Sequence, residues 1–374
     1  MKHSLPILRG RGAHGDPPNR FELLHIEPGE EEVVRDVKDR PTRYFRDQSR
    51  SVLTRNRSPD VGFDWSLNPY RGCEHGCVYC YARPTHEYLG FSAGLDFESR
   101  ILVKDEAPRL LLEAISRPGW SPTPLAMSGV TDPYQPVERR LRLTRRCLEV
   151  LESVGHPVAI VTKGRAVERD IDLLSSLAER QAAHVTLSIT TLDRRLQRSL
   201  EPRAAPPAHR LRTLQVLAES GVPVSVNIAP VIPGLTDHEI PSILEAAADH
   251  GATGAGMVML RLPGAVEGLF TRWLEEHVPG RAERVMARLR ELHEGAIYDP
   301  RFGHRMSGSG PYATHVQRLF RVVAERRGLN RGRRHLSTSS FRRPSPAREG
   351  GSALQLDLLD AGLREATPGA DGGD

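Results

Sequence analysis

Three of the four cysteines of the chain, Cys73, Cys77 and Cys80, lie within eight residues of one another in the spacing C-x3-C-x2-C. Close neighbours do not easily bridge to each other, and where thiols stay reduced such a cluster favours a metal over a disulfide. A zinc site would need a fourth ligand, His75 or a distant residue. Iron–sulfur clusters are held by thiolates at such tight spacings, and three ligands on a four-iron cluster leave one iron open to a reactive ligand.

The fourth cysteine, Cys147, has a different setting. It falls in an expected helix over 138–154, on the same apolar face as Leu148 and Leu151. Free cysteine is among the most buried residue types, so we expect Cys147 to be a core residue.

The elements that must position the cysteine loop form a repeated pattern. Short apolar runs bounded by Pro and Gly alternate with stretches of helical period. The expected strands are 63–67, 124–129, 157–162, 183–189, 223–228 and 256–260. The expected helices between them are 107–116, 138–154, 167–180, 208–220 and 237–250. This alternation predicts an α/β fold with a parallel sheet, and six units rather than eight predict an incomplete (β/α)6 barrel of the TIM type.

The remaining segments complete the expected organisation of the 374-residue chain. Residues 1–55 are expected to be a polar, partly disordered arm, and 56–264 to be the barrel, with the cysteine loop at 73–80. Residues 265–330 are expected to form a helical extension packed on the barrel. The tail 331–374 is rich in Arg, Ser, Pro and Gly and is expected to be disordered; a short apolar stretch within it, 352–359, is either a docking motif or a frayed helix.

Composition excludes few classes of function. No apolar run approaches the eighteen residues of a membrane helix, and the first residues lack an apolar signal core, so the cytoplasm is the default expectation. The net charge of +5 permits a nucleic-acid partner without establishing one.

The motif Cys73-x3-Cys77-x-Tyr79-Cys80, placed directly after the first expected strand, resembles the radical S-adenosylmethionine (SAM) superfamily. The resemblance implies that the three cysteines bind a [4Fe–4S] cluster whose fourth iron chelates SAM. It implies reductive cleavage of SAM to methionine and a 5′-deoxyadenosyl radical, with electrons from a donor such as flavodoxin or ferredoxin. Tyr79 matches the residue that packs by the adenine of SAM. The radical chemistry belongs to the cofactor, and the protein supplies orientation.

Further segments resemble a narrower group, the spore-photoproduct-lyase-like "DNA repair photolyase" group, and within it an uncharacterised bacterial subgroup. These segments are 66–73, 80–82, 131–136 and 161–163, and the resemblance spans roughly 61–330. Spore photoproduct lyase carries a hydrogen-donor cysteine near the turn after the second strand. This chain has none there, which argues against direct reversal of thymine photoproducts.

The turn after the second strand, with Ser128, Thr131 and Asp132, stands where the superfamily often has a Gly-Gly-Glu-like motif for the amino group of SAM. That motif is absent as such. Carbonyls of this turn and its three side chains offer acceptors to an ammonium group. The alternative is a plain turn that caps the next helix.

Later strand ends supply the other expected SAM contacts. By resemblance, Lys163 meets the carboxylate of SAM and Ser188 its ribose, and Asn227 points either at the cofactor or at a backbone group. The alternatives are a solvated lysine and hydroxyls that cap a turn. Arg203 is either an anion contact or a surface residue, and no further catalytic residue is assigned.

Three functions remain open from the sequence. The first is a radical SAM enzyme that acts on nucleic acid, as a DNA-repair lyase would. The second is a radical SAM enzyme that acts on a peptide, a protein or a small metabolite. The third, a non-catalytic metal-binding module, does not explain a barrel whose polar strand ends and cysteine loop lie at the same end.

Overall fold

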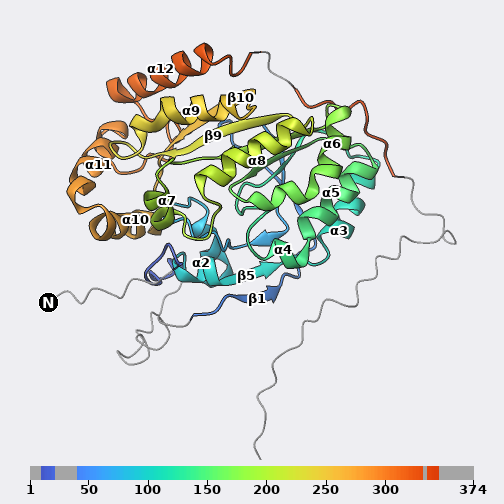
Figure 1. Cartoon of the computed structure of the whole chain (residues 1–374). Helices are drawn as coiled ribbons and strands as arrows, with labels where there is room; N and C mark the ends of the chain where they lie inside the picture. The colour runs from blue at the N-terminus through green and yellow to red at the C-terminus, as the bar shows by residue number, and fades with distance from the viewer. Residues whose placement is uncertain (1–9, 22–39, 332–334, 345–374) are drawn as a thin grey trace, which may run out of the picture.

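A seven-stranded sheet forms the centre of the computed structural model, which describes residues 10–21, 40–331 and 335–344 (Figure 1). Its strand order is β10-β9-β8-β7-β6-β3-β2. The strands are β2 (Leu53–Arg55), β3 (Trp65–Leu67), β6 (Leu125–Met127), β7 (Val158–Thr162), β8 (Ala183–Ser188), β9 (Val224–Val231) and β10 (Gly254–Met259). From β3 to β10 the six neighbours run parallel in chain order, and β2 is antiparallel to β3. No pairing in the described residues joins β10 to β2, so the barrel is incomplete, as predicted.

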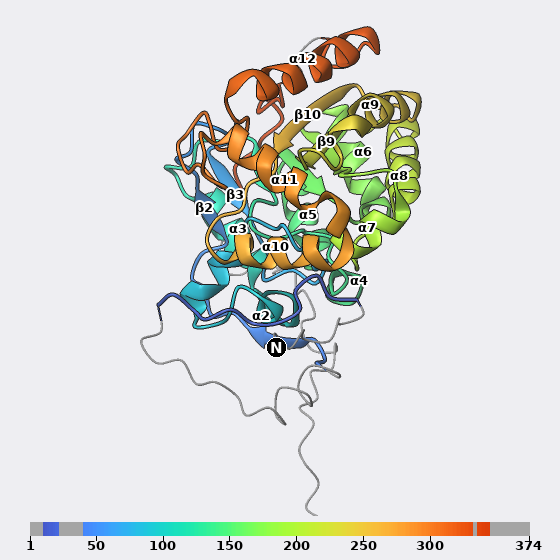
Figure 2. The same cartoon turned by 90° about the vertical axis from the view of Figure 1, so that its left-hand side faces the viewer.

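Helices that connect the strands cover the outer face of this sheet (Figures 1 and 2). They are α3 (Ala107–Ser116), α4 (Glu138–Leu141), α5 (Leu143–Ser153), α6 (Ile171–Glu179), α8 (Pro207–Glu219) and α9 (Ile240–Asp249). The expected single helix over 138–154 is two helices, because Arg142 adopts a left-handed conformation with φ 52°. The break lets the buried carboxylate of Glu138 accept the N–H of Thr144 at 3.0 Å and so satisfy the start of α5.

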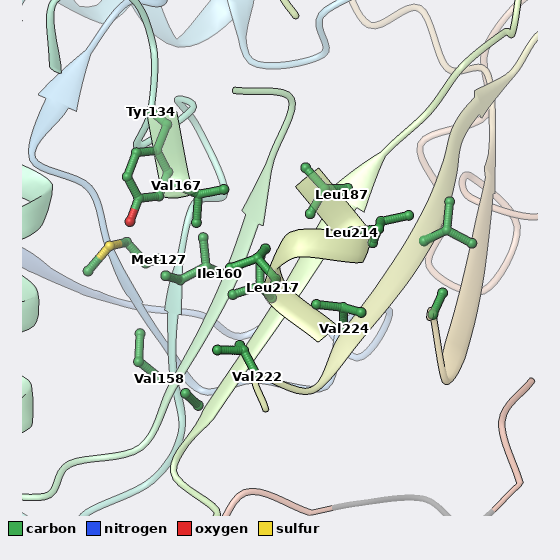
Figure 3. Close-up of a cluster of buried hydrophobic side chains, with 14 of the residues drawn as sticks. Met127, Tyr134, Val158, Ile160, Val167, Leu187, Leu214, Leu217, Val222 and Val224 are labelled. Carbon is green, nitrogen blue, oxygen red and sulfur yellow. The ribbon is translucent and has the colours of Figure 1, made fainter. Parts of the chain in front are cut away.

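The main core lies between the strands and these helices. Figure 3 shows Ile160, Leu187 and Val224 of the sheet against Leu214 and Leu217 of α8. Successive side chains of a strand point to opposite faces of the sheet, so the residues between these core positions face the barrel interior. Several of those interior positions carry small or polar residues: Ala126, Ala159, Ser225, Asn227 and Gly256. Two of them, Ala126 and Asn227, line a cavity inside the barrel.

A second, three-stranded sheet supports the cysteine loop. It has the order β1-β5-β4 and consists of β1 (Arg43–Arg46), β4 (Tyr70–Arg71) and β5 (Arg100–Val103). The 3-10 helix η1 (Arg83–Leu89) and α2 (Leu95–Ser99) connect β4 to β5, and the cysteines lie between β4 and η1.

Residues after β10 form three further helices, α10 (Ala265–His277), α11 (Pro279–Leu292) and α12 (Gly310–Arg326). Helix α10 contacts η1, next to the cysteine loop, and α12 packs on α9. The short helix α7 (Arg194–Leu200) follows β8. No helix in the described part of the chain is both long enough and apolar enough to cross a membrane.

The N-terminal residues are more structured than the predicted polar arm. Residues 43–46 and 53–55 are strands β1 and β2, and residues 10–21 pack on the cysteine loop. Strands of three or four residues that pair with distant parts of the chain show no sequence period, which is why the pattern missed them. The rest of the expected arm, 1–9 and 22–39, lies outside the described residues.

The prediction of a disordered tail is wrong for residues 335–344. The N–H groups of Ser337 and Arg342 donate to the carbonyls of Gln181 and Val154, both at 2.8 Å. The ring of Phe341 packs edge-on against His156, with 5.2 Å between centroids. One aromatic anchor and backbone hydrogen bonds hold this polar segment, and composition does not reveal either. The stretch 352–359 lies outside the described residues.

Candidate functional site

The cysteine loop is held to its surroundings by backbone hydrogen bonds. Cys73 N–H donates to the carbonyl of Phe97 at 2.9 Å, and Val78 N–H to that of Leu200 at 3.0 Å. Gly76, between the first two cysteines, has φ 67°, a conformation that favours glycine. Contacts from α2 and α7 therefore fix a loop that has no regular structure of its own.

A buried carboxylate joins the N-terminal segment to this loop. Glu98 accepts the N–H groups of Gly12 and Ala13 at 3.0 and 2.7 Å, and Arg83 pairs with it at 2.6 Å. A Cβ at Gly12 would stand 1.7 Å from the carbonyl oxygen of Gly76, so only glycine allows the approach. Residues 10–21 are thus part of the support of the cysteine loop, which the sequence analysis missed.

The three thiols fit an iron–sulfur cluster. Burial raises the pKa of Cys73, Cys77 and Cys80, a cost that metal coordination removes because it deprotonates the thiol outright. The backbone groups of Asp132 and Ala82 act in the opposite direction and favour the deprotonated form by lowering the pKa of Cys73 and Cys80, respectively.

The zinc alternative has less support. Within the described ranges, no three His, Cys, Asp or Glu side chains converge tightly enough to hold a single metal ion. Thiolates of a four-iron cluster stand farther apart, because each binds a different iron. His75, the nearby residue that a zinc site would use as a fourth ligand, is 3% exposed, and its Nδ1 lies 3.3 Å from Oδ2 of Asp132.

All ten residues selected from the sequence line one cavity of about 300 Å³. They are Cys73, Cys77, Tyr79, Cys80, Ser128, Thr131, Asp132, Lys163, Ser188 and Asn227. The ends of parallel strands and the loops that follow them meet at one rim of a barrel, which is why residues far apart in the sequence gather here. Their individual roles toward the cofactor remain predictions.

The side chains of Thr131 and Asp132 are already engaged within the protein. Asp132 accepts the hydroxyl of Thr162 at 2.6 Å and the N–H of Lys163 at 2.7 Å, and Thr131 donates to the carbonyl of Tyr70. Burial acts to raise the pKa of Asp132, but His75 and these hydrogen bonds outweigh it and lower the pKa. Asp132 therefore orients its neighbours. The carbonyls of Gly129, Thr131 and Asp132 in this turn also accept hydrogen bonds within the protein.

Ser188 and Asn227 are the polar groups that stay available. They are register partners on the adjacent strands β8 and β9. No hydrogen bond of either side chain occurs within the described residues, although both line the cavity. The pair is thus free to bind a ligand there.

A buried ionic network lies behind the cavity wall, centred on Glu201. This carboxylate pairs with Arg210, accepts the hydroxyls of Tyr79 and of Thr190, the latter at 2.8 Å, and lies 3.3 Å from Nζ of Lys163. Burial acts to raise the pKa of Glu201, but Arg210 and Lys163 outweigh it and hold the pKa well below its usual range. The sequence analysis missed Glu201 and Arg210.

Arg203 is turned away from this cavity. Its guanidinium lies 3.6 Å from Glu74 in the cysteine loop and donates to Thr42 at 3.2 Å. Of the two charged residues, Glu201 and not Arg203 contacts residues that line the cavity.

Replacing Lys163 with alanine is expected to weaken SAM binding by about 1.5–3 kcal/mol, because the change removes a charge-assisted hydrogen bond to a carboxylate. Nζ of Lys163 is now held by the carbonyl of Ala229 at 3.1 Å and by Glu201, which keeps Arg210 as its partner after the substitution.

Equilibrium dialysis of SAM with anaerobically reconstituted protein measures this affinity. Arg165→Ala is the matched control, since Arg165 lies two residues away and pairs with Glu168 at the surface. Equal affinity of Lys163→Ala and the wild type would remove Lys163 from the site.

Comparison with known proteins fits this geometry. The model of the radical SAM superfamily matches residues 67–247. An uncharacterised protein of Mycobacterium tuberculosis is 36% identical over 250 residues, which are 66% of this chain and 72% of that protein. A probable GTP 3′,8-cyclase of Methanopyrus kandleri is 27% identical over 161 residues, 42% of this chain and 50% of the cyclase.

Among solved structures, spore photoproduct lyase complexed with a dinucleoside spore photoproduct superposes with a TM-score of 0.53 at 16% identity. The match covers 81% of this chain and 85% of the lyase, and it shows a shared fold. Together with the family match and the mycobacterial relative, it leads to one conclusion. The chain belongs to the radical SAM superfamily, whose members are enzymes that use a [4Fe–4S] cluster and SAM.

Proposed function

We propose that this radical SAM enzyme acts on a nucleotide unit of a nucleic acid, inside the cavity next to the cysteine loop. The observation that carries the proposal is that the cysteines line the same cavity as Lys163, Ser188 and Asn227. A substrate that enters this cavity meets the cofactor directly. When bound, the cluster supplies the electron that cleaves SAM to methionine and the 5′-deoxyadenosyl radical that takes hydrogen from the substrate.

The residues of this chain bind and orient. The three cysteines hold three irons, and the ammonium of Lys163 pairs with the carboxylate of SAM. The free side chains of Ser188 and Asn227 bind the ribose, and the carbonyls of the turn at 128–132 accept the amino group. The ring of Tyr79, fixed through its hydroxyl by Glu201, packs by the adenine.

Support for a nucleotide substrate comes from two directions. The net charge is +5, which favours a polyanionic partner. Two similar proteins are described with a nucleotide or a dinucleoside: the cyclase of Methanopyrus kandleri with GTP, and spore photoproduct lyase with its dinucleoside photoproduct. GTP is a free nucleotide, so the cyclase supports the nucleotide unit, and the net charge supports the polymer.

Repair of a thymine photoproduct by hydrogen return from a cysteine is not part of the proposal. Besides the three cysteines of the loop, the chain has only Cys147, which is buried in the main core on α5. No further thiol is therefore present in the cavity to donate a hydrogen atom.

The test is the yield of 5′-deoxyadenosine from anaerobically reconstituted, dithionite-reduced enzyme. Slow cleavage of SAM is expected without substrate, and faster cleavage with oligonucleotides that contain damaged or modified bases. Peptide pools and nucleotide-free metabolite mixtures serve as controls. If those mixtures raise the yield of 5′-deoxyadenosine and no oligonucleotide does, the substrate is a peptide, a protein or a small metabolite and the proposal is wrong. In the cell, a flavodoxin or ferredoxin would take the place of dithionite, in a compartment that keeps thiols reduced, such as the cytoplasm.

A further inference from the structure

We propose that Arg261, stacked on Tyr81, binds a phosphate group of the nucleic-acid substrate at the open side of the barrel. The inference rests on the proposed function and adds the residue that recognises the substrate. Nothing in the sequence motifs singled out Arg261.

The placement of Arg261 is the first observation. It follows β10, the last strand of the open barrel, and lines the cavity. Its guanidinium carbon lies 4.0 Å from the ring centroid of Tyr81, the residue directly after Cys80. The hydroxyl of Tyr81 donates to the carbonyl of Gly129. The two side chains thus connect the end of β10, an edge strand of the sheet, to the cysteine loop.

The charge of Arg261 is the second observation. Its guanidinium forms no ion pair with a carboxylate in the part of the chain that the structure describes, whereas Arg83 and Arg210, which also influence the loop cysteines, each pair with a buried glutamate. The carboxylate of Asp60, which lies close enough to be influenced by Arg261, is already bound by Arg305 and by the N–H of Gly303.

A guanidinium that an aromatic ring holds in place, without a counter-ion, is ready for an anion from outside. Its planar fork of donors fits two oxygens of a phosphate at once. Stacking on Tyr81 restricts the side chain before the ligand arrives, which lowers the entropic cost of binding.

The wall around Arg261 is the third observation, and it favours a nucleotide over a simple carboxylate. The lining of the same cavity includes several apolar residues: Val61, Phe63, Val258, Leu260 and Met306. Tyr81 is 44% exposed at the same place. Aromatic and apolar side chains beside an arginine are the usual surface for a base and its phosphate.

The size of the cavity sets the form of the substrate. A cavity of about 300 Å³, which also takes the cofactor, excludes a paired duplex. A nucleotide must therefore leave its stack to reach the cofactor, at a cost that is smallest for unpaired or damaged bases. Arg261 would hold the phosphate of that unpaired nucleotide.

Fluorescence anisotropy tests the proposal with full-length, reconstituted protein and three labelled DNAs: a single strand, a fully paired duplex, and the same duplex with one bulged nucleotide. Wild type is expected to prefer the single strand and the bulge. Arg261→Gln is expected to bind both about tenfold or more weakly, with the slope of log K against log salt reduced by about 0.7 to 0.9. Arg261→Lys should recover part of the affinity, since it keeps the charge but loses the fork.

Arg318→Gln is the matched control, because Arg318 is exposed on α12 and its loss changes the net charge equally. Thermal melting of each variant separates a binding loss from a folding loss. Equal affinity and equal salt slope of Arg261→Gln and wild type would overturn the inference and leave the proposed function standing. If Arg261→Gln binds SAM more weakly but DNA as tightly as wild type, Arg261 contacts the cofactor, and the inference is overturned as well. Absence of DNA binding by the wild type would refute the proposed function itself, and the inference with it.

Discussion

Alanine in place of Cys73, Cys77 or Cys80 is expected to abolish the iron–sulfur cluster, whereas the wild type, reconstituted anaerobically, should hold about four iron and four sulfide per chain. The cluster depends on three thiolates, and each variant leaves two. No other cysteine can replace the missing ligand, because Cys147 is enclosed in the core on α5. SAM cleavage should disappear together with the cluster.

Iron and sulfide analysis, visible absorption and electron paramagnetic resonance of the reduced protein measure this result. Cys147→Ala is the matched control and should keep the full cluster, since it removes one thiol of the core and none of the loop. Circular dichroism shows whether each variant is folded. Wild-type protein with one zinc per chain and no visible absorption, after strictly anaerobic handling, would contradict the cluster assignment.

The parallel sheet could be predicted from the sequence because its strands carry strong local signals. The expected runs over 157–162 and 183–189 appear as β7 and β8 within one residue at each end. Their outward side chains fill the core under the helices, so the sequence there must be apolar. The segments 10–21 and 335–344 could not be predicted, because backbone hydrogen bonds and single anchors such as Phe341 hold them, and these leave no periodic pattern.

The same distinction applies to the candidate site. Lys163 and Ser188 could be found because each lies at or next to the end of a recognisable strand, and parallel strand ends converge. Asn227 could be found because it is a polar residue within a largely apolar strand, β9. Glu201 and Arg261 could not, because each is a single charged residue beyond a helix or strand, and what matters is its distance to residues elsewhere in the chain. Among 99 charged residues, nothing local separates a buried glutamate from an exposed one.

Glutamine in place of Glu201 is expected to lower the free energy of unfolding by about 3–5 kcal/mol, the usual cost of breaking a buried ion pair. Glu201 and Arg210 are 0% and 1% exposed, so the substitution leaves a guanidinium in the interior without its counter-ion. Glu219→Gln is the matched control: Glu219 is exposed at the end of α8, the helix that carries Arg210, and its loss should cost less than about 0.5 kcal/mol.

The dependence of this effect on pH separates loss of the charge from loss of packing. In the folded protein, Arg210 and Lys163 outweigh the effect of burial and hold the pKa of Glu201 well below its ordinary value of 4.5. The unfolded chain therefore takes up the proton first as the pH falls, and wild type loses the stability that this carboxylate contributes. Glutamine does not titrate, so the difference between wild type and Glu201→Gln should be full at pH 7 and shrink below about pH 4.5.

Urea unfolding at pH 7, 5 and 3.5 measures that difference directly. A gap that stays constant over this range would mean that the substitution acts through packing and not through charge. Because the same carboxylate also holds Lys163 and the hydroxyl of Tyr79, Glu201→Gln should weaken SAM binding at pH 7 under conditions where the variant is still folded. A stability loss without any change in SAM affinity would show that the network supports the barrel wall alone and does not orient the cofactor contacts.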